Sequence, residues 1–247
     1  MRNALVPTIF AIDTAAERCC LALSRGKDVQ TLLGQAGDTH LEHVLPMVDR
    51  LFAQAGLQPE LCDAFAFGSG PGSFTGLRVA CTIAQGLALA TARPVIAVGN
   101  LQLLAATAQV QVTEPSVSAK KTRCRIFSAA DARMQQAYWA VYDVCGGAWS
   151  EMAPPSLCEA SALPQLVSIW KPDCCAGNAG WMQPHLGSAA ALLCDVAVNG
   201  AVFAQLAHDK FLRGELLPPE QAAPAYIRER VALTVSERRA STWGAQL

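Results

Sequence analysis

Gly68-Ser69-Gly70-Pro71-Gly72-Ser73-Phe74-Thr75-Gly76-Leu77-Arg78 joins a short apolar run, Ala64–Phe67, to a segment of small and apolar residues that extends to Ala92. This order predicts a strand, a glycine loop and a helix. Such a loop leaves backbone N–H groups unpaired at a helix N-terminus, where an anion can accept them. No lysine follows the last glycine, so the loop lacks the charge that a Walker-type loop places on phosphates. The stretch predicts the scaffold of a nucleotide site from which part of the chemistry is missing.

Short apolar runs on both sides of this loop predict further strands. Upstream, two turns separate three runs, which predicts a meander of antiparallel strands. Downstream, a buried strand and a further helix are expected. The predicted strands are Ile9–Asp13, Cys19–Ser24, Val29–Leu33 and Pro94–Val98, and the further helix is Leu101–Ala108. The N-terminal part of the chain is therefore of the α/β class.

A helix is predicted between the meander and the glycine loop. Thr39 and Glu42 form a capping box, which marks its start. Apolar residues then recur at helical spacing until Gly56, and Pro46 is expected to kink the second turn. Its apolar side must face either a sheet or a second protein.

The helix predicted at Gly76–Ala92 is apolar around its whole circumference. Such a helix must be covered on more than one side. Ala80, Ala84 and Ala88 recur every four residues with Gly86 nearby, so another backbone could approach closely. Contiguous apolar surface that is left exposed marks an interface. Together the two helices predict a partner-binding surface, and the alternative is that one of them is buried wholly within its own lobe.

The second half of the sequence repeats features of the first. Ile126–Asp131, followed by a turn and another apolar run, parallels Ile9–Asp13, and Asp173–Gly180 echoes Asp63–Gly70. An apolar helical stretch, Ala201–Ala207, follows the second echo as a helix follows the first. An internal duplication with an eroded second copy explains this order. The predicted organisation is an N-terminal lobe at 1–108, a connection at 109–123, and a C-terminal lobe with a tail at 124–247.

Composition limits the possible functions. Of the 247 residues 52% are hydrophobic, enough for a sizeable core, and the net charge is −1. A protein that binds nucleic acid alone usually neutralises phosphates with Lys and Arg, and this chain carries no such excess. The ten cysteines contain no Cys-x-x-Cys pair, so we expect buried thiols in a reducing cytoplasm. No membrane span is expected.

The order of these motifs resembles a known family. A strand that ends in Asp at the start of each copy is typical of the actin/Hsp70/sugar-kinase superfamily, and several segments between residues 8 and 232 resemble the TsaB family, also called YeaZ. The segments that carry the resemblance are Ala11–Ala15, His40, Leu45–Val48, Gly70–Arg78, Ala84–Ala88, Asp131–Met134, Ala176–Asn178 and Pro224–Arg228. The resemblance implies duplicated, ribonuclease H-like lobes with mixed five-stranded sheets flanked by helices, the second lobe being eroded.

The resemblance also implies a function. TsaB-like proteins take part in making threonylcarbamoyladenosine next to the anticodon of tRNAs that read codons starting with A. They lack obvious catalytic machinery and pair with a related transferase, TsaD, while a small ATPase, TsaE, joins them. The implied interface is a four-helix arrangement, a homodimer could use the same surface, and tRNA is expected to bind mainly through the complex. The partner-binding residues predicted here are His40, Leu41, Val44, Leu45, Val48, Phe74, Leu77, Arg78, Cys81, Ala84, Gln85 and Ala88.

No catalytic residue and no metal site are expected. TsaD-like chains carry a His-x-x-x-His pair that can hold a metal, and Asn100 and Leu104 occupy those positions here. Asp13 holds the place of the superfamily's carboxylate near phosphates and metal, and it could instead satisfy N–H groups of a turn. The candidate nucleotide contacts are Asp13, Thr14, Gly70, Gly72 and Ser73, with ATP or ADP and Mg expected only in the complex. The alternative function is a small-molecule kinase or weak ATPase that uses Asp13 and the glycine loop.

Three further charged residues have two interpretations each. Asp131 and Arg133 could form an ion pair where the lobes meet, or Asp131 could simply stabilise a turn beside a solvated Arg133. Arg78 could bind an anion at the loop, or it could contact a carbonyl or a partner's carboxylate.

Overall fold

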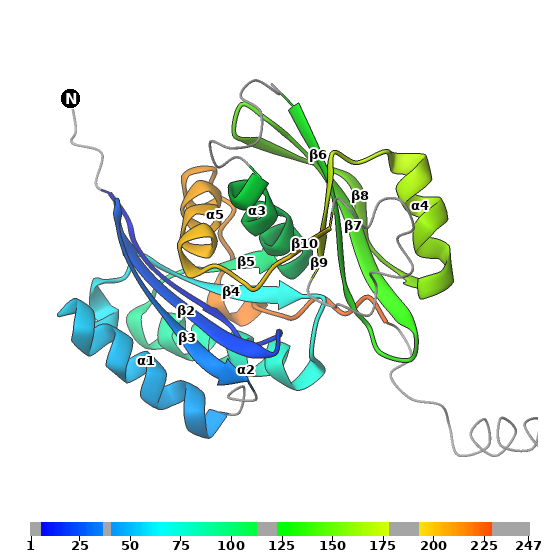
Figure 1. Cartoon of the computed structure of the whole chain (residues 1–247). Helices are drawn as coiled ribbons and strands as arrows, with labels where there is room; N and C mark the ends of the chain where they lie inside the picture. The colour runs from blue at the N-terminus through cyan, green and yellow to red at the C-terminus, as the bar shows by residue number, and fades with distance from the viewer. Residues whose placement is uncertain (1–5, 37–40, 113–122, 178–192, 229–247) are drawn as a thin grey trace, which may run out of the picture.

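The computed structural model describes residues 6–36, 41–112, 123–177 and 193–228 (Figure 1). Two five-stranded mixed sheets form its framework, and the first has the order β3-β2-β1-β4-β5. Strand β1 is antiparallel to β2 and parallel to β4, with Phe10 opposite Leu23 on one side and Phe65 on the other. The elements of this half are β1 (Thr8–Asp13), β2 (Arg18–Arg25), β3 (Asp28–Ala36), α1 (Leu41–Ala55), β4 (Ala64–Gly70), α2 (Phe74–Thr91), β5 (Val95–Gly99) and α3 (Asn100–Val112).

The second sheet has the order β8-β7-β6-β9-β10, which repeats the first strand for strand. Its elements are β6 (Arg123–Asp131), β7 (Gln136–Cys145), β8 (Ala148–Glu159), α4 (Leu163–Trp170), β9 (Cys174–Gly177), β10 (Leu193–Asp195) and α5 (Gly200–Leu212). The predicted duplication is confirmed, with one correction. Because β10 precedes α5, that helix is the counterpart of α3, whereas the sequence order suggested the counterpart of α2.

Alternation along β1 shows why the first sheet is buried on both faces. Phe10 and Ile12 point into the core beneath α1 and α2, while Ile9 and Ala11 point into the core beneath α3 and α5. All six residues of β1 are buried. A strand covered on both faces favours a continuous apolar run, as this sequence has.

Helices α3 and α5 lie between the two sheets, α1 and α2 cover the outer face of the first sheet, and α4 lies outside the second (Figure 1). The last helix of each repeat packs on the other repeat's sheet: α3 contacts β6, β7 and β9 while also touching β4 and β5 of its own half, and α5 contacts β1, β2, β3 and β5. One hydrophobic cluster therefore contains residues of both halves, such as Leu103 and Phe203. The repeats follow one another along the chain, but their cores are joined.

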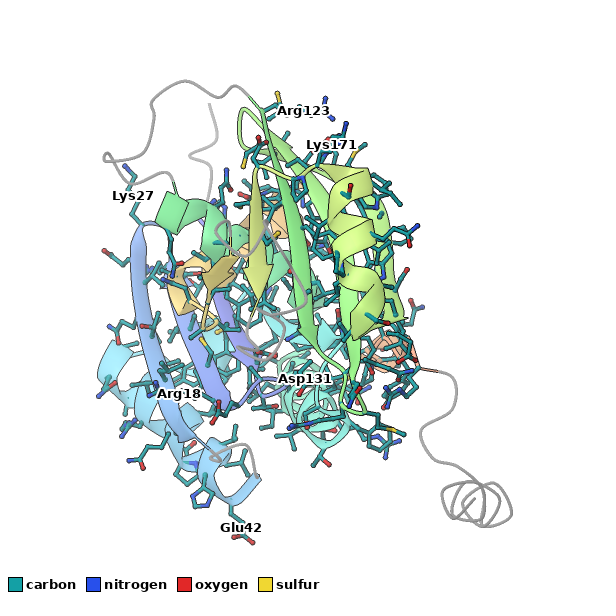
Figure 2. All side chains as sticks on the ribbon, turned by 45° about the vertical axis from the view of Figure 1, so that its right-hand side comes forward. Arg18, Lys27, Glu42, Arg123, Asp131 and Lys171 are labelled. Atoms are coloured by element: carbon teal, nitrogen blue, oxygen red, sulfur yellow. The ribbon has the colours of Figure 1, made fainter. Side chains whose placement is uncertain are left out.

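Local signals fix the ends of α2. Ser73 caps it by accepting a hydrogen bond from the Gly76 N–H, and Ala92 ends it in the left-handed conformation. Within the described residues α2 has the length and hydropathy of a membrane span. One side of it packs on β4 and β1, so this character has a structural reason in the core. Charged side chains such as Lys27, Glu42 and Lys171 lie at the periphery (Figure 2).

Some predicted features fall outside the described residues. Thr39 and His40 are among them, so the capping box of α1 stays a prediction, and the side chain of Leu41 is likewise not described. The second glycine-rich echo is described up to Gly177. Pro46 lies inside α1 and does not end it.

Candidate functional site

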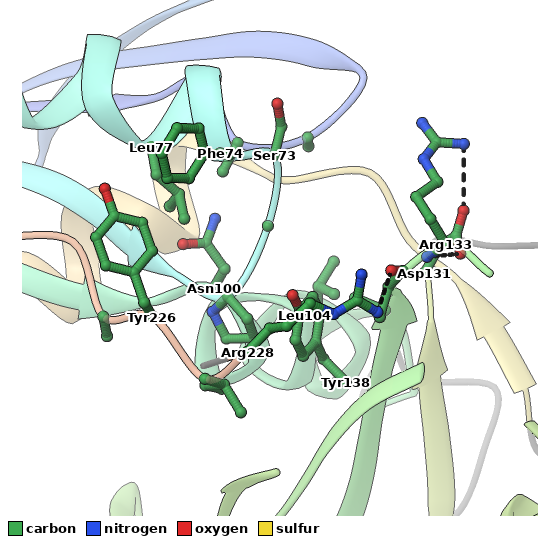
Figure 3. A pocket seen from close by; sticks show the side chains of 18 of the residues that line it. Ser73, Phe74, Leu77, Asn100, Leu104, Asp131, Arg133, Tyr138, Tyr226 and Arg228 are labelled. Carbon is green, nitrogen blue, oxygen red and sulfur yellow. Dashed lines mark hydrogen bonds and ion pairs between the residues drawn. The ribbon is translucent and has the colours of Figure 1, made fainter. Parts of the chain in front are cut away.

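A cavity of about 790 Å³ lies between the two halves (Figure 3). The turn between β1 and β2 lines it with Ala15–Glu17, and the glycine loop and first turn of α2 line it with Pro71–Phe74 and Leu77. The start of α3, the end of β6 and the turn after it, and residues 225–228 form the remaining walls. The cavity therefore collects both copies of the repeated strand-turn unit at one place.

Asp13, the candidate carboxylate, is sealed away from this cavity. It is fully buried, and its Oδ1 accepts hydrogen bonds from the Ala15 N–H at 3.2 Å and from Nδ2 of Asn100 at 2.8 Å. Oδ2 has no hydrogen-bond partner among the described residues. Burial raises the pKa of Asp13, and the two hydrogen bonds lower it only in part. A Cβ at Gly68 would lie 2.2 Å from Oδ1, so the strand backbone covers this carboxyl group.

The glycine loop packs against its own chain. The Ser73 N–H donates to the Ala15 carbonyl at 3.0 Å, and the Thr14 hydroxyl donates to the Gly76 carbonyl. A Cβ at Gly72 would lie 2.7 Å from Cβ of Ala15, and one at Gly76 would lie 1.9 Å from the Thr14 carbonyl oxygen. The glycines are therefore explained by close approach of two backbones. Of the predicted nucleotide contacts, Gly72 and Ser73 line the cavity, whereas Asp13, Thr14 and Gly70 do not.

Asn100 and Leu104 occupy the first turns of α3 and both line the cavity. Both polar atoms of the Asn100 side chain are hydrogen-bonded within the protein: the oxygen accepts from the Gly70 N–H at 2.7 Å, and the nitrogen donates to Asp13. A leucine side chain offers no metal ligand. Within the described ranges no group of three or more His, Cys, Asp and Glu side chains is placed to hold a metal ion.

The turn between β6 and β7 carries Asp131 and Arg133, and the structure shows both predicted roles together. The Asp131 carboxylate accepts the Arg133 N–H at 2.7 Å and lies 3.4 Å from the Arg133 guanidinium. The arginine side chain is otherwise solvated. Arg133, Met134 and Gln135 all adopt positive φ, a conformation that costs roughly 1–2 kcal/mol for each residue other than glycine.

Arg78 lies over Phe74 and reaches Tyr226 in the segment that follows α5, so among the described residues its contacts are aromatic and not a loop carbonyl. Its Nε donates to the Tyr226 hydroxyl at 3.0 Å, and its guanidinium lies 4.0 Å from the centre of the Phe74 ring. The Phe74 and Tyr226 rings are themselves 5.4 Å apart. Tyr226 and Arg228 line this site although the sequence did not predict a role for either, and both belong to the Pro224–Arg228 motif.

The predicted partner-binding residues divide by exposure. Of the ten whose side chains the structure describes, six point into the core of their own half: Val44, Val48, Leu77, Cys81, Ala84 and Ala88. Leu45 and Phe74 are 46% and 41% exposed, Arg78 is exposed, and Gln85 is half-buried. The buried members shape the helices from beneath, and the exposed members are the ones that another chain could touch.

The outward face of α2 differs from the one that the alanine spacing suggested. Ala80, Ala84 and Ala88 face the sheet, whereas Thr82 and Gly86 face outward. A Cβ on Gly86 would meet no atom within 4 Å. An exposed glycine inside a helix costs roughly 1 kcal/mol relative to alanine, and nothing in the described part of the chain requires it.

The comparisons agree with this geometry. The family model of TsaD, tRNA N6-adenosine threonylcarbamoyltransferase, matches residues 34–209. The tRNA threonylcarbamoyladenosine biosynthesis protein TsaB of Escherichia coli K12 is 32% identical over 233 residues, covering 91% of this chain and 96% of that protein. The TsaB protein of Haemophilus influenzae is 40% identical over 132 residues, about half of each chain.

Solved structures point the same way. YeaZ from Pseudomonas aeruginosa superposes with a TM-score of 0.76 at 30% identity, covering 89% of this chain and 99% of that one. A transferase of Magnetococcus marinus is 34% identical over 67 residues, 27% of this chain and 19% of that protein. Its match marks the kinship between the two subunit types. The chain belongs to the TsaB (YeaZ) family of tRNA threonylcarbamoyladenosine biosynthesis proteins.

Proposed function

We propose that this chain is the non-catalytic partner subunit of the complex that installs the threonylcarbamoyl group on the adenosine next to the tRNA anticodon. Its task is to bind and support a TsaD-like transferase subunit. The observation that carries the proposal is the burial of Asp13 beneath Gly68, together with membership of the TsaB family. The strand, glycine loop and helix of a nucleotide site are present, but the carboxyl group of Asp13 is used inside the protein core.

The geometry of the cavity supports a role without catalysis for this chain. A general acid or base must come within hydrogen-bond reach of the reacting group, and Asp13 is covered by the strand backbone. The N–H of Ser73 is already bonded to Ala15. Leu104 stands where the transferase would carry a metal-binding histidine. These features count against the alternative function, a small-molecule kinase or weak ATPase.

The exposed sides of α1 and α2 form the docking face in this proposal. Leu45 on α1 and Thr82 and Gly86 on α2 are exposed and uncharged, and the exposed Arg78 lies one turn before Thr82 on the same side of α2. Gly86 allows another helix to approach closely, which explains a residue that costs helix stability. The TsaD family model spans both helices, so a related subunit can present a similar pair. The same face could form a homodimer when the partner is absent.

The remaining assignments rest on the resemblance to the TsaB family. A TsaE-like ATPase joins the complex, and ATP or ADP with Mg binds in the assembled complex. With a net charge of −1 the chain leaves most tRNA contacts to its partners. The proposed location is the cytoplasm, where ten cysteines without a Cys-x-x-Cys pair are expected to stay reduced.

Reconstitution tests the proposal. The chain is mixed with TsaD-like and TsaE-like subunits, tRNA and an enzyme that supplies threonylcarbamoyl-adenylate, and modified adenosine is measured by mass spectrometry. We expect modification with all components and none when this chain acts alone or is omitted. Thr82→Arg should abolish partner binding in a pull-down, whereas Gln165→Arg on the exposed face of α4, a matched control, should not.

Calorimetry with ATP and Mg separates the alternative. Saturable binding and turnover by the isolated chain, lost in Asp13→Ala, would favour the kinase or ATPase and contradict a purely supporting role. We expect no turnover. Thr82→Arg with unchanged partner affinity would contradict the docking face.

A further inference from the structure

Residues 214–228, called the strap here, leave α5 and run along the first half of the molecule (Figure 1). Leu217 pairs with Val95 through two backbone hydrogen bonds of 2.9 Å, which extends the edge of the first sheet. The Gln85 side chain then donates to the Pro219 carbonyl at 2.8 Å. The beginning of the strap is thus fixed to β5 and to the flank of α2.

The middle of the strap lies against the glycine loop. The Ala225 N–H donates to the Ser69 carbonyl at 2.7 Å, and the Ala225 carbonyl oxygen lies 2.8 Å from where a Cβ of Gly70 would be. The hydroxyl of Tyr226 accepts from Arg78 at 3.0 Å. A residue larger than glycine at position 70 would therefore push the strap away from the loop.

Two residues later the strap reaches the other half of the molecule. The Arg228 guanidinium donates to the Ala132 carbonyl at 2.9 Å and to the side-chain oxygen of Gln136, and it lies 3.9 Å from the sulfur of Met134. Ala132 and Gln136 are the two ends of the turn between β6 and β7. One nitrogen, Nη2 of Arg228, therefore bridges both ends of the turn, while Nη1 faces the Met134 sulfur between them.

That turn is under backbone strain. Arg133, Met134 and Gln135 are three consecutive residues with positive φ, and none is glycine. Such conformations persist when their surroundings hold them in place. The bonds from Arg228 supply part of this hold, along with the hydrogen bond from the Ala132 N–H to the Gln136 carbonyl.

We propose that the strap is a clasp that ties the second half of the molecule to α2 and closes one wall of the cavity. Tyr226 and Arg228 are its two fastenings, one in each half. Residues 225–228, the glycine loop and the end of β6 line the same cavity, so the clasp lies between its walls (Figure 3). Releasing Arg228 frees the strained turn and opens this side of the cavity. The inference holds for the chain by itself and does not depend on the partner.

Hydrogen–deuterium exchange on the full chain tests the clasp. In Arg228→Ala we expect peptides that cover 130–136 and 222–227 to exchange faster by on the order of tenfold, the effect of losing charge-assisted hydrogen bonds. Peptides from β2 and α1 should exchange as in the wild type. Arg228→Lys should give an intermediate effect, because the shorter lysine side chain keeps the charge but loses the contact that Nη1 makes with the Met134 sulfur.

Arg213→Ala is the matched control, since Arg213 is an exposed arginine that pairs with Glu215 at the start of the strap and touches neither the turn nor the part of the strap at 222–228. It should leave the exchange of both regions unchanged. Unchanged exchange of 222–227 in Arg228→Ala would overturn the clasp, even if the turn itself exchanged faster. Equally faster exchange throughout the molecule would also overturn it, because Arg228 would then stabilise the whole fold and not this junction.

Discussion

Replacing Gly86 by alanine should stabilise the chain alone and weaken its complex. The position is helical and exposed, and the added Cβ meets no atom within 4 Å. The helix propensities of glycine and alanine differ by about 0.8–1.0 kcal/mol, so the free energy of unfolding should rise by about 1 kcal/mol. For a chain of 247 residues this corresponds to a rise in melting temperature of roughly 2–4 °C.

The same methyl group should act in the opposite direction on binding. If a partner helix crosses α2 at Gly86, the Cβ overfills the contact at a cost of roughly 1–3 kcal/mol, which weakens binding by roughly 5- to 150-fold. Gly86→Leu should weaken it further. Urea unfolding measures the first effect, and calorimetric titration with the TsaD-like subunit measures the second.

Gly56 supplies a control for the stability argument. A Cβ there also meets no atom within 4 Å, but its φ is +61° because it ends α1 in the left-handed conformation. Gly56→Ala should therefore destabilise the chain by about 1 kcal/mol. A stabilised Gly86→Ala variant with unchanged partner affinity would refute the close crossing of helices, and a destabilised one would refute the account of its exposed position.

Three further substitutions test the interior by urea unfolding. Gly68→Ala should lower the free energy of unfolding by about 3 kcal/mol, since its Cβ would clash with Asp13; an unfolding curve like the wild type's would contradict this packing. Because burial raises the pKa of Asp13, its stabilising contribution is present below pH 3.8 and is lost as pH rises, so the free energy of unfolding of Asp13→Asn should rise relative to that of the wild type between pH 3 and pH 7. Hydrogen bonds from Arg125 lower the pKa of Asp143, whose contribution is present at neutral pH and lost as pH falls, so Asp143→Asn should lose about 2 kcal/mol at pH 7 and less at pH 3. Stability differences that do not change with pH would contradict both assignments.

Sequence patterns predicted the elements of the fold because their causes are local. The apolar run Ile9–Asp13 and the glycine at position 56 act within a few residues, and the structure has β1 and the end of α1 there. The orientation of α2 could not be predicted in the same way. A helix that is apolar all round has no sequence marker for its inward side, so Ala84 and Gly86 are equally suited by sequence to face a partner. Only the position of the sheet, which buries Ala84, distinguishes them.

The candidate site was predicted in part for the same reason. The glycine loop and the Asp at the end of β1 were found, but the sequence does not tell whether such a carboxylate faces the cavity or lies beneath Gly68. Arg228 lies 92 residues from Gln136 along the chain, and no local pattern joins them. The left-handed turn at Arg133 contains no glycine, so the sequence has no signal that predicts it.

Because each repeat's last helix packs on the other repeat's sheet, the two halves should behave differently when they are produced as separate fragments. Since α3 belongs to the first repeat but covers the second sheet, and α5 does the reverse, each half produced separately would leave an apolar sheet face bare. Neither fragment should remain monomeric and folded in isolation, yet the two should reassemble when mixed. The two copies of the duplicated unit therefore depend on each other for folding.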